Sequence, residues 1–193
     1  MFEQSKSAKR RYNSGNFHSK YFRGSGIDVG AGNDNLGNLI NHFPGITSVR
    51  GWDMPDGDAQ YLISIETNTF DFLHSSHCLE HMVYYDVALN HWIRVVKPGG
   101  YLIITIPDET MYEHNNWPSH FNDDHKWSFR MGNTSQLPKS VNVLSMLEKI
   151  NDMAVVQKIE LIDEFYHTNI DRNFDQTLLP NTECCIEIIL RKL

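Results

Sequence analysis

The sequence has 193 residues, with little cysteine and fewer positive than negative charges. Cysteine occurs only at Cys78, Cys184 and Cys185, an odd number that includes an adjacent pair, so we expect no disulfide framework and a reducing compartment. The formal net charge is −7, from 17 Lys and Arg against 24 Asp and Glu. Because binding to a phosphate backbone needs a basic face, this balance argues against a nucleic-acid partner.

Long apolar runs are also absent. No stretch approaches the roughly 18 apolar residues of a membrane span, and the first residues are basic without the apolar segment of a secretory signal. We therefore expect no membrane partner and a cytoplasmic protein. At about 150 residues per domain, the length predicts one domain over residues 1–193, with a core that needs no metal or disulfide. The oligomeric state stays open.

Histidine, by contrast, is abundant. The chain has ten histidines, and seven of them lie between His74 and His125. Because an imidazole titrates near neutral pH and also binds metals, this cluster indicates where the chemistry of the protein could take place.

Strand and helix patterns alternate along most of the chain. The predicted strands cover residues 27–29, 46–52, 70–76, 101–106, 155–166 and 182–190. Apolar residues at helical spacing predict helices over residues 36–43, 83–96 and 143–150, the last with Ser140 as its N-cap. This alternation predicts an α/β fold with a doubly wound sheet and right-handed crossovers.

Two segments do not fit the alternation. Residues 1–23 are polar and basic with scattered aromatics, which favours an N-terminal arm that docks elsewhere or closes as a lid. Its run Lys9-Arg10-Arg11 is more typical of a solvated helix face than of a site. Residues 108–139 are polar, aromatic and rich in histidine, and they are too long for a plain connection, so we expect them to serve function.

A glycine-rich turn follows the first predicted strand. Gly30 and Gly32 come directly after Asp28-Val29, where glycine lets the backbone turn sharply and lets a ligand approach the N–H groups of a helix start. A dinucleotide fingerprint would need a third glycine at position 35, which is Asn35. This departure weakens the case for a dinucleotide ligand.

The motif Asp28-x-Gly30-x-Gly32 resembles the first motif of class I S-adenosylmethionine-dependent methyltransferases, in particular the small-molecule enzymes of the type 11 kind, although Asp34 stands where that family usually has a small residue. Later segments resemble further motifs of the family in the same order: Phe70–Ser76 followed by Leu79-Glu80-His81, and Arg94–Leu102 with its Lys-Pro-Gly-Gly turn. The resemblance implies a mostly parallel Rossmann-like sheet with an antiparallel final strand, and S-adenosyl-L-methionine as the cofactor.

The resemblance also implies a set of cofactor-binding residues. The first motif contributes Asp28, Gly30 and Gly32. Asp53, at the end of the second predicted strand, matches the acidic residue that accepts hydrogen bonds from the ribose hydroxyls, as a carboxylate can. The other implied cofactor contacts are Met54, Asp58, Ala59, Ser75 and Ser76. Only four residues separate Asp53 from Asp58, whereas a helix and a strand usually intervene in the family.

The methyl acceptor is expected to be a small molecule or a sugar-containing metabolite, methylated on oxygen or nitrogen. Candidates for its catalytic base are His77, His120 and His125, because each follows a strand whose carboxyl end should face the cofactor. The histidines of residues 108–139 could instead form an internal hydrogen-bond network, or could bind a metal together with Asp123 and Asp124. We expect no metal site.

Two other functions fit parts of the sequence. The segment His77-Cys78-Leu79-Glu80-His81 matches the H-x-x-E-H signature of one class of zinc hydrolases, which needs both histidines on one helical face. A protein of the same fold could also bind the cofactor without transferring its methyl group. Methyl transfer is the favoured function because it accounts for the most motifs.

Overall fold

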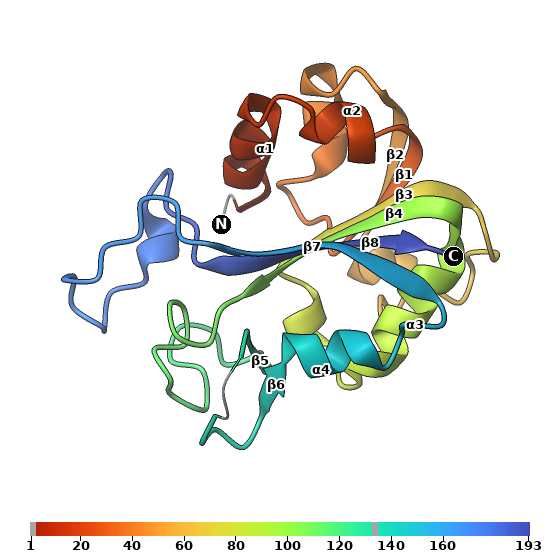
Figure 1. Cartoon of the computed structure of the whole chain (residues 1–193). Coiled ribbons are helices and arrows are strands. Elements are labelled where there is room, and N and C mark those ends of the chain that lie inside the picture. Colours follow the sequence, from red (N-terminus) through yellow and green to blue (C-terminus); the bar gives the residue numbers. More distant parts are fainter. Residues whose placement is uncertain (1–2, 133–134) are drawn as a thin grey trace.

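The computed structural model describes residues 3–132 and 135–193 (Figure 1). Residues 1–2 of the predicted arm and 133–134 of the predicted functional segment lie outside the described residues. The helices are α1 Glu3–Asn13, α2 Phe17–Tyr21, α3 Tyr85–Val95 and α4 Val143–Glu148, with 3₁₀ helices η1 Leu36–His42, η2 Met54–Asp56, η3 Leu79–His81 and η4 Gln176–Leu178. The strands are β1 Gly24–Val29, β2 Ile46–Trp52, β3 Phe70–Ser76, β4 Val96–Pro107, β5 Ser128–Arg130, β6 Ser140–Asn142, β7 Ala154–Ile162 and β8 Cys185–Lys192.

Six strands form the main sheet in the order β2-β1-β3-β4-β8-β7. Strands β2, β1, β3 and β4 are parallel, whereas β8 pairs antiparallel with both β4 and β7. The expected mostly parallel sheet with an antiparallel final strand is therefore confirmed. A second, two-stranded sheet joins β5 and β6.

Helices cover both faces of the main sheet (Figure 1). Helices α1 and α2 lie on one face, and α3 and α4 lie on the other. Side chains alternate between the faces along each strand. In β3, for example, Phe72 packs in the apolar cluster beneath the N-terminal helices and Leu73 packs in the larger cluster on the opposite face. This double burial explains the continuous apolar runs of the central strands.

The N-terminal arm is an integral part of the fold. Ala8 of α1 and Phe17 of α2 are buried in the cluster that contains Phe22 and Phe72. Arg11, which the sequence favoured as solvated, is fully buried, so that expectation was wrong. The reason is a polar stripe on the sheet that Arg11 can pair with, formed by His74 on β3, Thr105 on β4 and Glu187 on β8.

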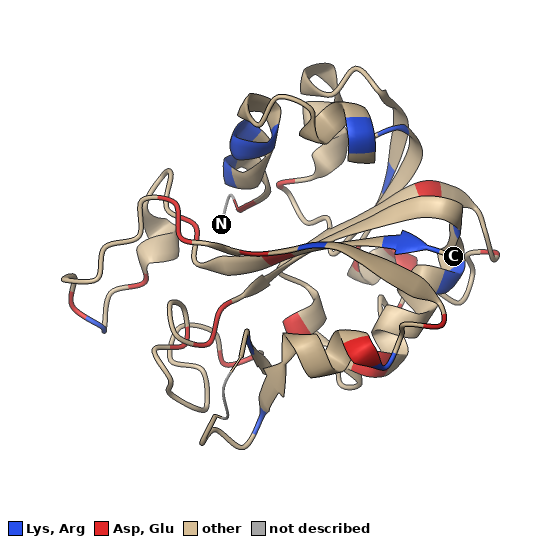
Figure 2. Cartoon of the chain, in the orientation of Figure 1, with Lys and Arg blue, Asp and Glu red and all other residues tan. Residues whose placement is uncertain are grey.

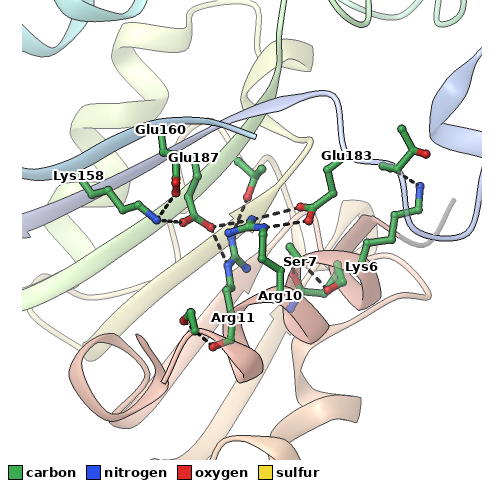
Figure 3. A network of polar contacts seen from close by, with 12 residues as sticks. Lys6, Ser7, Arg10, Arg11, Lys158, Glu160, Glu183 and Glu187 are labelled. Atoms are coloured by element: carbon green, nitrogen blue, oxygen red, sulfur yellow. Dashed lines mark hydrogen bonds and ion pairs between the residues drawn. The ribbon is translucent and has the colours of Figure 1, made fainter. Parts of the chain in front are cut away.

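Figure 3 shows this network of charges between α1 and the sheet. The Nε atom of Arg11 donates to Glu187 at 2.8 Å, and Arg10 donates both to Glu183 at 2.9 Å and to Glu187 at 3.1 Å. Lys158 of β7 reaches the other oxygen of Glu187 at 3.1 Å. Charge-assisted bonds of this kind compensate the desolvation of Glu187, and they orient α1 on the sheet.

Three local expectations needed correction. The segment after the glycine-rich turn is helical, but it is the 3₁₀ helix η1; Gly37 and two asparagines are weak α-helix formers. The N-cap of α4 is Asn142, whose side chain accepts from Leu144 N–H at 2.9 Å, whereas Ser140 begins β6. Helix α3 starts only at Tyr85, leaving Val83 exposed.

Candidate functional site

Two cavities open at the carboxyl ends of β1, β2 and β3. The larger has a volume of about 550 Å³ and the smaller about 130 Å³, and Gly30 lines both. The larger cavity is lined by Gly30, Asp53, Met54, Gly57, Asp58, Ala59, His77, Cys78, His81, Met82 and Asp124. The smaller is lined by Gln4, Asp28, Gly30, Ala31, Gly32, Asn33, Asp34 and Ser76. Eight of the nine cofactor contacts expected from the sequence thus line one cavity or the other.

Glycine is needed at the two positions of the first motif for different structural reasons. Gly30 has φ of 76°, and a Cβ there would lie 2.6 Å from the Cβ of Cys78, so no side chain fits. Gly32 has φ of 51°, but no atom lies within 4 Å of the position that its Cβ would take. Gly30 therefore permits close packing of the turn against the segment after β3, whereas Gly32 keeps space open beside the smaller cavity.

Asp28 is almost fully buried at the base of the smaller cavity. Its Oδ2 accepts from Leu36 N–H at 2.7 Å, and its Oδ1 lies 2.6 Å from Nδ1 of His74. The other ring nitrogen of His74 faces Arg11, which can only donate, so Nδ1 carries the proton and donates to Asp28. Burial, opposed by Asp28, lowers the pKa of His74 and keeps the ring neutral.

Asp34, which replaces a small residue of the family motif, ties the turn to the N-terminal helix. Its carboxylate accepts from the backbone N–H of Ser5 at 2.9 Å and from the Ser5 hydroxyl at 2.5 Å. Gln4 of the same helix lines the smaller cavity beside Asp34. Apart from the departure at position 34, no local pattern predicts this pairing, because the two residues are 29 positions apart.

The short connection after β2 still brings Asp53 and Asp58 to one cavity. Asp53 is the N-cap of η2. Its side chain accepts from Met54 N–H at 2.8 Å and its own N–H donates to Asp56 at 3.0 Å, which forms a capping box. Strand β2 is an edge of the main sheet. The compact turn from Asp53 to Asp58 thus stands where the family usually has a further helix and strand.

The two serines at the end of β3 have different surroundings. Ser76 lines the smaller cavity. Ser75 is fully buried, donates from its hydroxyl to the carbonyl of Val29 at 3.0 Å, and lines neither cavity. The structure therefore places Ser75 in the packing between β1 and β3.

His77 is the one proposed catalytic histidine that lines the larger cavity. Its φ of 53° is unusual for a residue other than glycine, and its N–H donates to the carbonyl of Thr105 at 2.9 Å. Residues held in such sparsely populated conformations concentrate at functional sites. Burial, followed by the nearby positive groups, lowers the pKa of His77 to about 3, so its imidazole is neutral at pH 7.

The other two catalytic candidates lie elsewhere. His120 is exposed, and its ring lies against the ring of Phe121. His125 is buried, with its Nδ1 held 2.6 Å from Glu113, and it lines neither cavity. The long segment still reaches the site, because Asp124 lines the larger cavity.

The geometry does not fit the zinc-hydrolase signature at residues 77–81. That signature needs His77 and His81 on one face of an α-helix. Instead, His77 has a left-handed backbone and precedes the short 3₁₀ helix η3, which contains His81. The two histidines are therefore not presented as a helical pair.

Comparison with known proteins decides the family. The profile of the methyltransferase domain family matches residues 10–142, more than half of the sequence. The chain belongs to this family. It is an S-adenosylmethionine-dependent methyltransferase, as the resemblance of its motifs predicted. No relative was found among the curated proteins.

Solved structures share the fold of this methyltransferase at low sequence identity. An S-adenosylmethionine-dependent methyltransferase from Archaeoglobus fulgidus has 18% identity and a TM-score of 0.63, with 100% of this chain and 95% of that chain covered. A proposed methyltransferase of the same type from Listeria monocytogenes has 13% identity and a TM-score of 0.62, covering 98% and 99%. A proposed methyltransferase bound to the Trm112 activator of Haloferax volcanii has 14% identity and a TM-score of 0.61, covering 97% and 92%.

The methyltransferase has residues suited to its cofactor. The open space beside Gly32 admits a ligand close to the backbone, and the carboxylates of Asp53 and Asp58 offer hydrogen-bond acceptors in the larger cavity. Among the residues that the structure describes, no helix is long and apolar enough to cross a membrane.

Proposed function

We propose that this methyltransferase transfers the methyl group of S-adenosylmethionine to an oxygen or nitrogen atom of a small molecule, a class that includes sugar-containing metabolites. The observation that carries this proposal is the 550 Å³ cavity, where His77 faces the same space as Asp53 and Asp58. We assign Asp53 to the ribose and Asp58 with Ala59 to the adenine, while Gly30, Gly32 and Ser76 hold the methionine part.

When bound, S-adenosylmethionine would supply a methyl group on a positively charged sulfur, which is a good leaving group for transfer of the methyl group to an acceptor lone pair. The protein then has to align the acceptor molecule with the methyl group and to accept a hydrogen bond from the acceptor molecule. His77 suits this task because its imidazole is neutral at pH 7 and keeps a lone pair available. We infer that His77 accepts a hydrogen bond from the acceptor and so orients its lone pair toward the methyl group.

A small acceptor is favoured by the state of the basic N-terminal helix. Figure 2 shows Lys and Arg on α1 and α2, but three of the four cations of α1 are paired with carboxylates. Lys6 pairs with Glu3 at 2.7 Å, and Arg10 and Arg11 pair with carboxylates of the sheet and its adjoining loop. These three side chains therefore form ion pairs within the protein, and they do not form a free basic surface for a nucleic-acid backbone.

The experiment has two steps. Calorimetry with S-adenosylhomocysteine should give one binding site per chain. A screen of small molecules with radiolabelled S-adenosylmethionine then identifies the acceptor, after which His77→Ala should lower kcat at least about tenfold. His120→Ala is the matched control, because His120 lies outside the cavity, and it should keep normal turnover. Normal turnover of His77→Ala would remove His77 from the mechanism, and no binding of S-adenosylhomocysteine would overturn the proposed function.

A further inference from the structure

Beside the cofactor cavity, a carboxylate is buried without a hydrogen-bond partner. Glu80 is fully buried, and neither of its side-chain oxygens has a partner among the described residues. The Nε2 atoms of His81 and His125 lie 3.9 and 4.0 Å from its Oε1, too far for hydrogen bonds. A buried carboxylate in this position is costly unless a positive charge compensates it.

Both histidines are oriented by a second carboxylate. Nδ1 of His81 lies 2.9 Å from Asp124, and Nδ1 of His125 lies 2.6 Å from Glu113. A carboxylate accepts hydrogen bonds, so each Nδ1 donates a hydrogen bond to its carboxylate, and each Nε2 is the ring atom left to bind an ion. The two rings are nearly perpendicular, at 79°, with centroids 4.9 Å apart.

Three potential ligand atoms thus converge: one carboxylate oxygen of Glu80 and the Nε2 atoms of His81 and His125. All three atoms lie within 4.8 Å of one another. Histidine ligands that donate their second nitrogen to a carboxylate are typical of protein metal sites, where the carboxylate fixes the tautomer and the ring orientation. Ligand bonds of about 2.1 Å would draw the three atoms together by several tenths of an ångström.

We propose that Glu80, His81 and His125 bind one divalent transition-metal ion, with Asp124 and Glu113 orienting its two histidines. Two imidazoles and one carboxylate favour an ion such as Zn²⁺ or Mn²⁺, whereas Mg²⁺ prefers oxygen ligands and retains its water. From the sequence alone we expected no metal site, and this proposal departs from that expectation.

The fold assembles this site from two distant segments. Glu80 and His81 belong to η3, which directly follows β3. The backbone N–H groups of Lys126 and Trp127 donate to the carbonyl of Glu80 at 2.8 and 3.3 Å, and so hold the neighbouring His125 against the same turn. Local backbone bonds therefore fix the spacing of the ligands before any ion binds.

The position of the site indicates its role. His81 and Asp124 also line the cavity that contains His77, so the ion lies at the wall of that cavity. Resting on the proposed function, this inference assigns to the ion the task of holding an oxygen or nitrogen atom of the acceptor at this wall, in an open coordination position.

The test uses the untagged full-length protein after treatment with a chelator. Titration calorimetry with Zn²⁺, Mn²⁺ and Mg²⁺ should show one site for Zn²⁺ or Mn²⁺, at least about tenfold tighter than for Mg²⁺. Glu80→Gln and His125→Asn should weaken that binding at least about 100-fold, and Glu113→Gln by about 10- to 100-fold. His120→Asn is the matched control, because His120 belongs to the same segment but lies outside the cluster, and it should bind normally.

Circular dichroism checks that each variant is folded, and His81→Asn provides a second ligand change at a partly exposed position. The proposal would be overturned if neither Zn²⁺ nor Mn²⁺ bound at one site per chain, or if Mg²⁺ bound more tightly than both. Unchanged metal binding by folded Glu80→Gln and His81→Asn would also overturn it. Calorimetry of the metal-free protein with S-adenosylhomocysteine separates the two proposals. Metal binding without cofactor binding would overturn only the proposed function, and cofactor binding without metal binding would overturn only the metal site.

Discussion

The guanidinium of Arg11 lies 3.0 Å from Nε2 of His74, and both side chains are fully buried. Since arginine only donates, this contact fixes the tautomer of His74 and directs its Nδ1 proton to Asp28 of the glycine-rich turn. The N-terminal helix is thereby linked, through one ring on β3, to the residues around the smaller cavity. The position of the N-terminal helix and the shape of the cofactor site therefore both depend on the contacts of His74 with Arg11 and Asp28.

Arg11→Met should destabilise the protein by about 3 kcal/mol, because it leaves Glu187 and His74 buried with fewer partners. Arg10 and Lys158 still contact Glu187 and keep the loss from being larger. Urea unfolding measures the change. Arg23→Met at an exposed position is the control, with an expected change below about 0.5 kcal/mol. A loss below about 1 kcal/mol for Arg11→Met would mean that the network contributes little.

Acid should destabilise the protein through Glu187. Burial alone would raise its pKa, but Arg11, Arg10 and Lys158 hold the pKa of Glu187 well below its usual value of 4.5. The folded protein then binds fewer protons than the unfolded chain, so the contribution of Glu187 is complete above about pH 4.5 and is lost as the pH falls below it. Urea unfolding between pH 7 and pH 3 should show a smaller decrease for Glu187→Gln than for the wild type. Equal decreases in the free energy of unfolding for Glu187→Gln and the wild type would contradict the role of Glu187 in acid destabilisation.

Two glycine substitutions separate packing from backbone strain. Gly30→Ala should cost about 3 kcal/mol or more, because its Cβ would meet Cys78 at 2.6 Å in addition to the strain of a φ of 76°. Gly99→Ala has a similar φ of 79° with no atom within 4 Å of its Cβ, so it should cost only about 1–2 kcal/mol. Thermal and urea unfolding report both values, and equal losses would refute the packing argument.

Asp53→Asn should weaken S-adenosylhomocysteine binding at least about tenfold, because a charged acceptor for the ribose hydroxyls is lost while the turn keeps its cap. Asp56→Asn alters the other half of the same capping box and does not touch the cavity. Calorimetry should therefore show near-normal affinity for this control. Equal affinity of Asp53→Asn and the wild type would remove Asp53 from the cofactor site.

Much of the fold follows from the sequence alone. Strands at residues 46–52 and 70–76 were predicted with the bounds that the structure has, because apolar runs between turn residues carry a strong local signal. The first motif also determined that Gly30 and Gly32 lie at a turn after β1. Helix type and helix ends were less certain, since they depend on caps such as Asn142 that compete with neighbouring residues.

Only the tertiary structure decided which polar residues meet. The sequence indicated a cofactor site and a cluster of histidines, but it ranked His77, His120 and His125 together, whereas the fold brings His77 to the cavity and leaves His120 exposed. It likewise gave no sign that Arg11 would be buried against Glu187, 176 positions away. Local sequence patterns set the period and ends of each element. Pairing of buried charges depends on register and on packing between distant elements, which no local pattern encodes.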